Sequence, residues 1–185
     1  MNVAAAPDAA RRAGFTRSCE DDVGRLLAVL TAAVPVGGRI LELGTGTGVG
    51  LAWITSGLVG RDDVEVLSVE HDARLAALAA TGPWPPGVRI ETGDALDVLA
   101  RSGTFDLIFA DAPAGKTTGL AHTLAALRPG GVLVVDDMAP RPDDPFDDEV
   151  RPRLEAVAVA LRADDRLVIV ELAWASGVIV ATRRR

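Results

Sequence analysis

From residue 39 onward, short apolar runs alternate with stretches long enough for helices. The runs are rich in Val, Ile and Leu and mostly end at an acidic residue or glycine, which is typical of buried parallel strands. The predicted strands are Arg39–Leu43, Val64–Val69, Val88–Glu91, Phe105–Ala110 and Val132–Val135. The helices predicted between them are Val49–Leu58, Asp72–Ala80, Ala95–Arg101 and Thr118–Leu127. This alternation predicts an α/β fold with an open, doubly wound, Rossmann-like sheet.

The two ends of the chain depart from this alternation. Glu20–Ala33 has the apolar spacing of a helix and precedes the first strand, and Val150–Arg162 is a second helical stretch. Arg166–Leu172 and Val178–Thr182 are β-rich runs whose link, Ala-Ser-Gly after Trp174, is too short for a crossover. We therefore expect a seven-stranded sheet, mostly parallel, that ends in an antiparallel hairpin. The chain is interpreted as one domain, with a helical lead-in (1–38), a ligand-binding core (39–137) and a terminal helix and hairpin (138–185).

Composition narrows the class of partner. The 185 residues are 49% hydrophobic and carry a net charge of −7, so a single folded domain is expected and a broad nucleic-acid surface is not. The single cysteine, Cys19, excludes a disulfide framework and a clustered cysteine metal site, and it fits a reducing cytoplasm. No run approaches a membrane span of about 18 apolar residues. A cytoplasmic protein with a small-molecule partner is the expectation.

Lysine usage singles out one residue. Of 19 basic residues only Lys116 is a lysine, and arginine cannot give up its proton near neutral pH whereas lysine can. Lys116 is either a functional constraint or a chance survivor, and composition alone does not decide between them.

A glycine-rich loop follows the first predicted strand and has the form acidic-x-Gly-x-Gly-x-Gly. Glycines at alternate positions allow a ligand to approach the backbone where the strand turns into a helix. The dinucleotide fingerprint fails because Val49 stands where its last glycine belongs, and no Gly-Lys-Ser/Thr follows for a P-loop. Glu42 is expected to place a carboxylate beside the ligand, which would repel a pyrophosphate and attract an ammonium group.

Acidic residues also follow the second and third strands. Glu70 is placed to accept both ribose hydroxyls of an adenosine that lies across the switch point of the sheet. His71 is interpreted as a neighbour of the adenine or as a surface residue, and Asp72 as a helix N-cap. Asp94 can cap a helix and also meet the adenine amino group, since the two roles are compatible.

A third acidic group follows the fourth and fifth strands. Because these strand ends share one crevice, Asp111, Asp136 and Asp137 are expected to converge. A bound cation would relieve their repulsion, and a set of carboxylate oxygens suits Mg²⁺ better than zinc. The alternative is that Asp136 or Asp137 caps a turn while Asp111 binds only the cofactor.

Together, the segments ELGTGTGVG, VLSVEHD, TGDA, FDLIFADAPAGK and GGVLVVDD resemble the class I S-adenosylmethionine-dependent methyltransferases. The likeness is greatest to the small bacterial O-methyltransferases related to the catechol and caffeoyl-CoA enzymes, and it spans roughly residues 14–182. It implies a cofactor-binding set with Asp111 near both the sulfonium and a metal ion. The set comprises Glu42, Gly44, Thr45, Gly46 and Gly48 for the methionine part, Glu70 at the ribose, and Asp94 with Ala95 at the adenine, with His71 and Gly93 as neighbouring cofactor-binding residues.

The resemblance also implies a mechanism, and the chain departs from the family's pattern at two points. Metal-dependent relatives have an Asp-Asn pair where this chain has Asp136-Asp137, and they place a basic lysine three residues after the Asp whereas Lys116 follows Asp111 by five. By this likeness, a cation would bind a hydroxyl of the small-molecule substrate and Lys116 would take its proton. A homodimer is common among these enzymes.

Several expectations stay open at this level. Gly14–Cys19 and the acidic loop Pro140–Glu149 are candidate covers of the crevice, and Trp53 and Trp174 are expected in the core. Two other functions remain alternatives: an S-adenosylmethionine-binding protein without catalysis, and an NAD-binding oxidoreductase.

Overall fold

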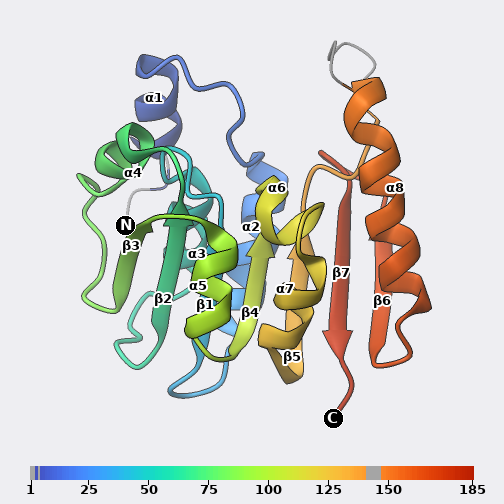
Figure 1. Cartoon of the computed structure of the whole chain (residues 1–185). Coiled ribbons are helices and arrows are strands. Elements are labelled where there is room, and N and C mark those ends of the chain that lie inside the picture. The colour runs from blue at the N-terminus through green and yellow to red at the C-terminus, as the bar shows by residue number, and fades with distance from the viewer. Residues whose placement is uncertain (1–2, 4, 141–146) are drawn as a thin grey trace.

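The computed structural model describes residues 3, 5–140 and 147–185 and places seven strands in one sheet. The strands are β1 (Arg39–Leu43), β2 (Glu65–Glu70), β3 (Val88–Thr92), β4 (Phe105–Ala110), β5 (Leu127–Val135), β6 (Leu167–Leu172) and β7 (Val178–Arg183). Their order is β3-β2-β1-β4-β5-β7-β6 (Figure 1). Neighbours among β1 to β5 are parallel, and β7 runs antiparallel to both β5 and β6. The predicted doubly wound sheet with a terminal hairpin is confirmed.

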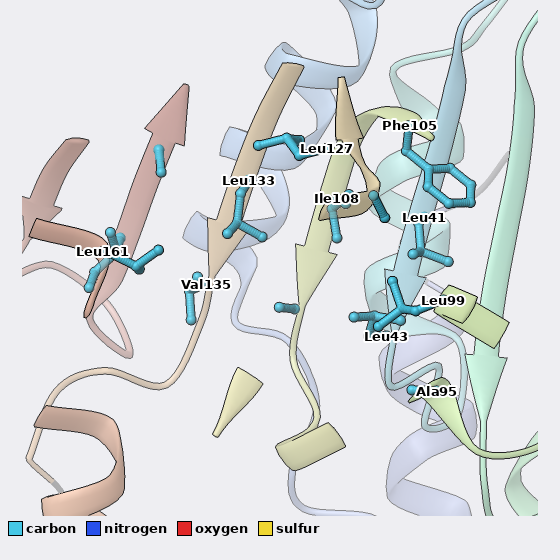
Figure 2. Close-up of a cluster of buried hydrophobic side chains, with 14 of the residues drawn as sticks. Leu41, Leu43, Ala95, Leu99, Phe105, Ile108, Leu127, Leu133, Val135 and Leu161 are labelled. Atoms are coloured by element: carbon cyan, nitrogen blue, oxygen red, sulfur yellow. The ribbon is translucent and has the colours of Figure 1, made fainter. Parts of the chain in front are cut away.

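Helices cover both faces of the sheet. They are α1 (Ala5–Arg12), α2 (Asp21–Ala32), α3 (Val49–Ser56), α4 (Ala73–Ala79), α5 (Ala95–Arg101), α6 (Pro113–Lys116), α7 (Leu120–Ala126) and α8 (Asp147–Ala163). On one face, Leu99 of α5 and Leu161 of α8 belong to a buried cluster with strand residues such as Leu41 and Ile108 (Figure 2). On the other face, α2 and α3 pack against a second apolar cluster. Burial on both faces explains why the strands are apolar along nearly their whole length.

Strand register aligns the carboxyl ends of the parallel strands. Leu43 of β1 is level with Val69 of β2 and Ala110 of β4, and Ala110 is level with Val135 of β5. The next residue of each of these strands therefore lies at the same edge of the sheet, where β2 ends and the loops after β1, β4 and β5 begin. These residues are Gly44, Glu70, Asp111 and Asp136.

The structure differs from the predicted elements in a few places. Helices α1 and α6 were not expected, and β5 begins at Leu127 because that residue pairs with Phe105 across an irregularity in the register. Helix α8 begins at Asp147, so residues 147–149 of the predicted acidic loop are helical, and acidic residues favour a helix N-terminus. Residues 141–146 of that loop lie outside the described residues. Trp53 packs against the core as expected, whereas Trp174 is 41% exposed.

Within the described ranges, each helix falls short of the length and apolar character needed to cross a bilayer.

Candidate active site

A cavity of about 750 Å³ lies at the carboxyl edge of the parallel strands. Its volume is in the range of about 300–1,000 Å³ that is usual for small-molecule sites. The cavity is bordered by the segment before α2, the glycine loop, the ends of β2, β3 and β4, and the first turns of α8. Among the predicted site residues, those on its wall are Gly44, Thr45, Gly46, Glu70, His71, Gly93, Asp94, Ala95, Asp111, Lys116 and Asp137. Glu42, Gly48 and Asp136 stand behind the wall.

The glycine loop has the backbone conformation that its sequence predicts. Gly44, Gly46 and Gly48 all have positive φ, and Gly48 is the N-cap of α3. A Cβ atom on Gly44 would lie 3.0 Å from Ala112 Cβ, so the close approach of the loop to the end of β4 requires glycine there. A Cβ atom on Gly48 would lie 2.9 Å from the Trp84 ring. Gly48 therefore serves packing, whereas Gly44 and Gly46 face the cavity.

Glu70 links the end of β2 to the glycine loop. Its Oε2 accepts a hydrogen bond from the Gly46 N–H at 2.8 Å, and its Oε1 accepts one from the Asp72 N–H at 3.0 Å. The residue is 5% exposed and borders the cavity, while the His71 side chain is 88% exposed with Nδ1 3.1 Å from Glu70 Oε1. A carboxylate accepts about four hydrogen bonds, so Glu70 keeps acceptor capacity for a ligand.

Two helix caps are confirmed. Asp72 accepts from the N–H groups of Arg74 and Leu75 at the start of α4, and Asp94 accepts from the Leu96 N–H at 2.7 Å at the start of α5. Because Asp94 also borders the cavity, the structure permits the second role predicted for it.

Glu42 is not beside the ligand space, contrary to expectation. The residue is fully buried behind the glycine loop, where its Oε2 accepts a hydrogen bond from the Ser68 hydroxyl. Its Oε1 has no hydrogen-bond partner. Burial raises the pKa of Glu42 to about 8, against the opposing effect of the Ser68 hydrogen bond, and the nearby Glu70 raises it further.

This raised pKa makes stability depend on pH. Because the pKa in the folded state exceeds the ordinary value of 4.5, the Glu42 contribution is fully present below pH 4.5 and is lost as pH rises through about 8. Glu42→Gln has no such titration. We expect the free energy of unfolding of wild type to fall relative to Glu42→Gln by up to ~1.4 kcal/mol per pH unit in this window. Urea denaturation of both proteins at pH 5, 7 and 9 measures the difference, and parallel curves would contradict the prediction.

Three carboxylates converge at the ends of β4 and β5, as predicted. Asp111, Asp136 and Asp137 each offer an oxygen within 4.8 Å of the others. Asp136 accepts hydrogen bonds from the Ser176 hydroxyl and, at 2.7 Å, from the Asp137 N–H. Burial raises the pKa of Asp111 well above its ordinary value, and repulsion by Asp136 and Asp137 adds to the increase, while Lys116 opposes it. The cluster therefore brings together three carboxyl groups whose charged forms are disfavoured by burial and by mutual repulsion when no cation is bound.

Lys116 reaches this cluster from the short helix α6. Its side chain is buried, and Nζ donates a hydrogen bond to the main-chain oxygen of Asp136 at 3.0 Å. The turn before it depends on Gly115, which has a φ of 88° and lies where a Cβ atom would collide with Leu43. The Thr123 hydroxyl donates to the Gly115 carbonyl at 2.7 Å and holds this turn. The spacing of five residues after Asp111 thus still brings Lys116 to the carboxylates.

Comparison with known proteins agrees with this geometry. A family model described as a methyltransferase domain matches residues 41–138. A protein of Mycobacterium tuberculosis named as a probable O-methyltransferase is 36% identical over 173 residues, covering 87% of this chain and 75% of the relative. The chain belongs to the class I O-methyltransferase family.

Solved structures share the fold of this O-methyltransferase. The O-methyltransferase TomG from Streptomyces achromogenes, in complex with SAM, has a TM-score of 0.81 at 23% identity, over 99% of this chain and 89% of that one. An O-methyltransferase from Bacillus cereus, in complex with SAH, has a TM-score of 0.83 at 23% identity, over 98% of this chain and 90% of that one.

The donor atoms of the carboxylate cluster fit a hard divalent cation. Carboxylate oxygens are the ligands that Mg²⁺ prefers, and Asp111, Asp136 and Asp137 each offer one within 4.8 Å of the others. Nearby polar groups suit this purpose, because Ser176 and the Asp137 N–H orient Asp136. Asp111, Asp136 and Asp137 therefore fit the ligand set of a hard divalent cation.

Two segments border the cavity of the O-methyltransferase from outside the sheet. Phe15, Arg17, Ser18 and Cys19 lie along its wall, and a Cβ atom on Gly46 would be 3.0 Å from the Phe15 ring. Glu149, Val150 and Arg151 of α8 border it on another side, and Arg151 donates to the main-chain oxygens of Met138 and Ala139. Both candidate covers, as far as the structure describes them, reach the cavity.

Proposed function

We propose that this O-methyltransferase transfers the methyl group of S-adenosylmethionine to a hydroxyl of a small molecule, with help from a divalent cation. One observation carries the proposal: a single cavity joins the glycine loop and Glu70 to the carboxylate cluster and Lys116. Donor and acceptor sites in one cavity are what direct transfer between two bound molecules requires.

The donor side of the cavity offers groups that match S-adenosylmethionine. Glu70 has acceptor capacity for ribose hydroxyls, and Asp94 and Ala95 lie where an adenine would follow. Gly44 and Gly46 present backbone without side chains to the methionine part. The two structural neighbours, which are complexes with SAM and SAH, are consistent with this donor.

The acceptor side combines the carboxylates with a proton acceptor. Asp111, Asp136 and Asp137 would hold the cation, which when bound lowers the pKa of an acceptor hydroxyl. Lys116 is buried beside them and donates a hydrogen bond to the main-chain oxygen of Asp136, which supports the proposal that its amine, when neutral, would accept the proton of that hydroxyl.

A methyl-transfer screen tests the proposal. Purified protein would be incubated with labelled S-adenosylmethionine and catechols, hydroxylated acids or polyketide-like phenols, with Mg²⁺ or with a chelator. Labelled product that depends on Mg²⁺ is expected. Donor binding without transfer to any acceptor would favour a binding protein without catalysis, and transfer unaffected by chelator would remove the cation from the mechanism.

A further inference from the structure

Glu42 is separated from the cavity by two hydroxyl groups. Its Oε2 is hydrogen-bonded to the Ser68 hydroxyl of β2, and Ser68 Oγ lies 2.5 Å from Thr45 Oγ1 in the glycine loop. Glu42 and Ser68 are both 0% exposed, and Thr45 is 3% exposed. Among these three residues only Thr45 borders the cavity. A continuous chain of hydrogen bonds therefore runs from the interior to the wall of the donor site.

The main chain of Thr45 is already held by other contacts. Its N–H donates to the Val69 carbonyl at 3.1 Å, and the Thr45 carbonyl accepts from the Gly48 N–H at 2.8 Å. The side-chain rotamer of Thr45 is not fixed by these main-chain contacts, and the hydrogen bond between its hydroxyl and Ser68 fixes it. Ser68 has a defined position in turn because Glu42 holds its hydroxyl.

Burial of Glu42 is unfavourable for stability taken alone. An unpaired, fully buried carboxyl oxygen costs free energy, and here Oε1 is that oxygen. The neighbouring helix makes room for it, since a Cβ atom on Gly50 would collide with Oε1. A carboxyl group retained at such a place, with glycine opposite it, indicates a role other than stability.

We propose that Glu42 is a positioning residue, which orients the Thr45 hydroxyl toward the donor through Ser68 and does not touch the donor itself. This inference rests on the proposed function, because the donor is taken to be S-adenosylmethionine. It assigns to the acidic residue of the loop an indirect role in place of the direct one expected from the sequence.

Four variants and a control test the relay by calorimetric binding of S-adenosylhomocysteine to the full chain. Glu42→Met keeps the volume but removes the acceptor, Glu42→Gln keeps an acceptor for Ser68, Ser68→Ala removes the middle hydroxyl, and Thr45→Val removes the last one. Thr31→Val is the matched control, because Thr31 is a buried threonine in α2 whose hydroxyl has no hydrogen-bond partner. Circular dichroism verifies that each variant is folded.

Glu42→Met and Ser68→Ala should each weaken binding about tenfold, the loss expected for one well-placed hydrogen bond. Glu42→Gln should bind within about threefold of wild type, and Thr31→Val should not differ from it. The decisive measurement uses double variants. Ser68→Ala or Glu42→Met, combined with Thr45→Val, should bind no more weakly than Thr45→Val alone, because the hydroxyl that Ser68 and Glu42 orient is already gone. A purely structural role would instead lower the melting temperature of Glu42→Met, which we expect to stay at or above that of wild type.

Three results would overturn the inference. If Ser68→Ala binds S-adenosylhomocysteine like wild type and Glu42→Met binds it more weakly, Glu42 contacts the donor directly. Losses that multiply in the Thr45→Val background would mean that the three residues act separately. Wild-type protein that binds no donor at all would overturn the proposed function and this inference with it, and that result is distinguishable from the first two.

Discussion

Replacing Lys116 with methionine is expected to lower turnover by about 10²–10⁴-fold and to leave donor affinity nearly unchanged. Methionine keeps most of the apolar stem of the buried side chain but lacks the amine and cannot accept a proton. Lys116 Nζ contacts Asp136 on the acceptor side of the cavity, so the donor side is not disturbed. Single-turnover rates and calorimetric binding of S-adenosylhomocysteine measure the two quantities separately.

Lys116→Arg separates proton transfer from charge. Arginine keeps the positive charge and the capacity to donate to the Asp136 carbonyl, but it does not give up or take a proton near neutral pH. We expect the arginine variant to be nearly as slow as Lys116→Met. Activity close to wild type in Lys116→Arg would show that only the charge matters, and unchanged turnover in both variants would remove Lys116 from the mechanism.

Asp111→Asn should have opposite effects on stability and on turnover. The metal-free variant is expected to melt a few degrees higher than wild type, because one buried carboxylate that is repelled by its neighbours is replaced by a neutral amide. Each kcal/mol gained in the free energy of unfolding raises the melting temperature by about 2–4 °C. Turnover should fall at least about 10²-fold, and the thermal shift on adding Mg²⁺ should disappear, since the cluster has lost a charged ligand. Thermal melts with Mg²⁺ or chelator and the methyl-transfer assay measure these changes.

Asp62→Asn is the control for that experiment, because it removes the same charge from an exposed residue. It should leave the Mg²⁺ shift and turnover as in wild type. A Mg²⁺-dependent thermal shift in Asp111→Asn as large as that of wild type would mean that the ion binds elsewhere.

Much of the site could be predicted because strand ends are visible in the sequence. In a parallel sheet the residues at the end of each apolar run meet at one edge, so the sequence predicts that Glu70 and Asp111 lie there, and both border the cavity at that edge. The same reasoning fails for Glu42, because this residue lies within β1, one position before the strand ends. There the alternation of side chains along the strand decides which face of the sheet the side chain points to. Sequence gives no sign that this face lies behind the loop.

Other contacts of the site are not predicted by local sequence pattern, even where the segment itself, such as Gly14–Cys19, is a candidate cover. Ser176 lies in the link between β6 and β7, far along the chain from Asp136, and only the pairing of β7 with β5 brings the two together. Phe15 lies in a segment without regular secondary structure, and its contact with Gly46 depends on how α1 and α2 are placed. Long-range contacts of this kind follow from topology and not from local pattern.

The position of β7 has a consequence for how the enzyme is made. This strand lies between β5 and β6 although it is translated after both, so a nascent chain that ends before residue 178 has no partner for β6 and leaves one side of β5 open. Ser176, which holds Asp136, also emerges from the ribosome only at that late stage. A partly synthesised chain that lacks β7 therefore lacks the pairing that brings Ser176 to Asp136.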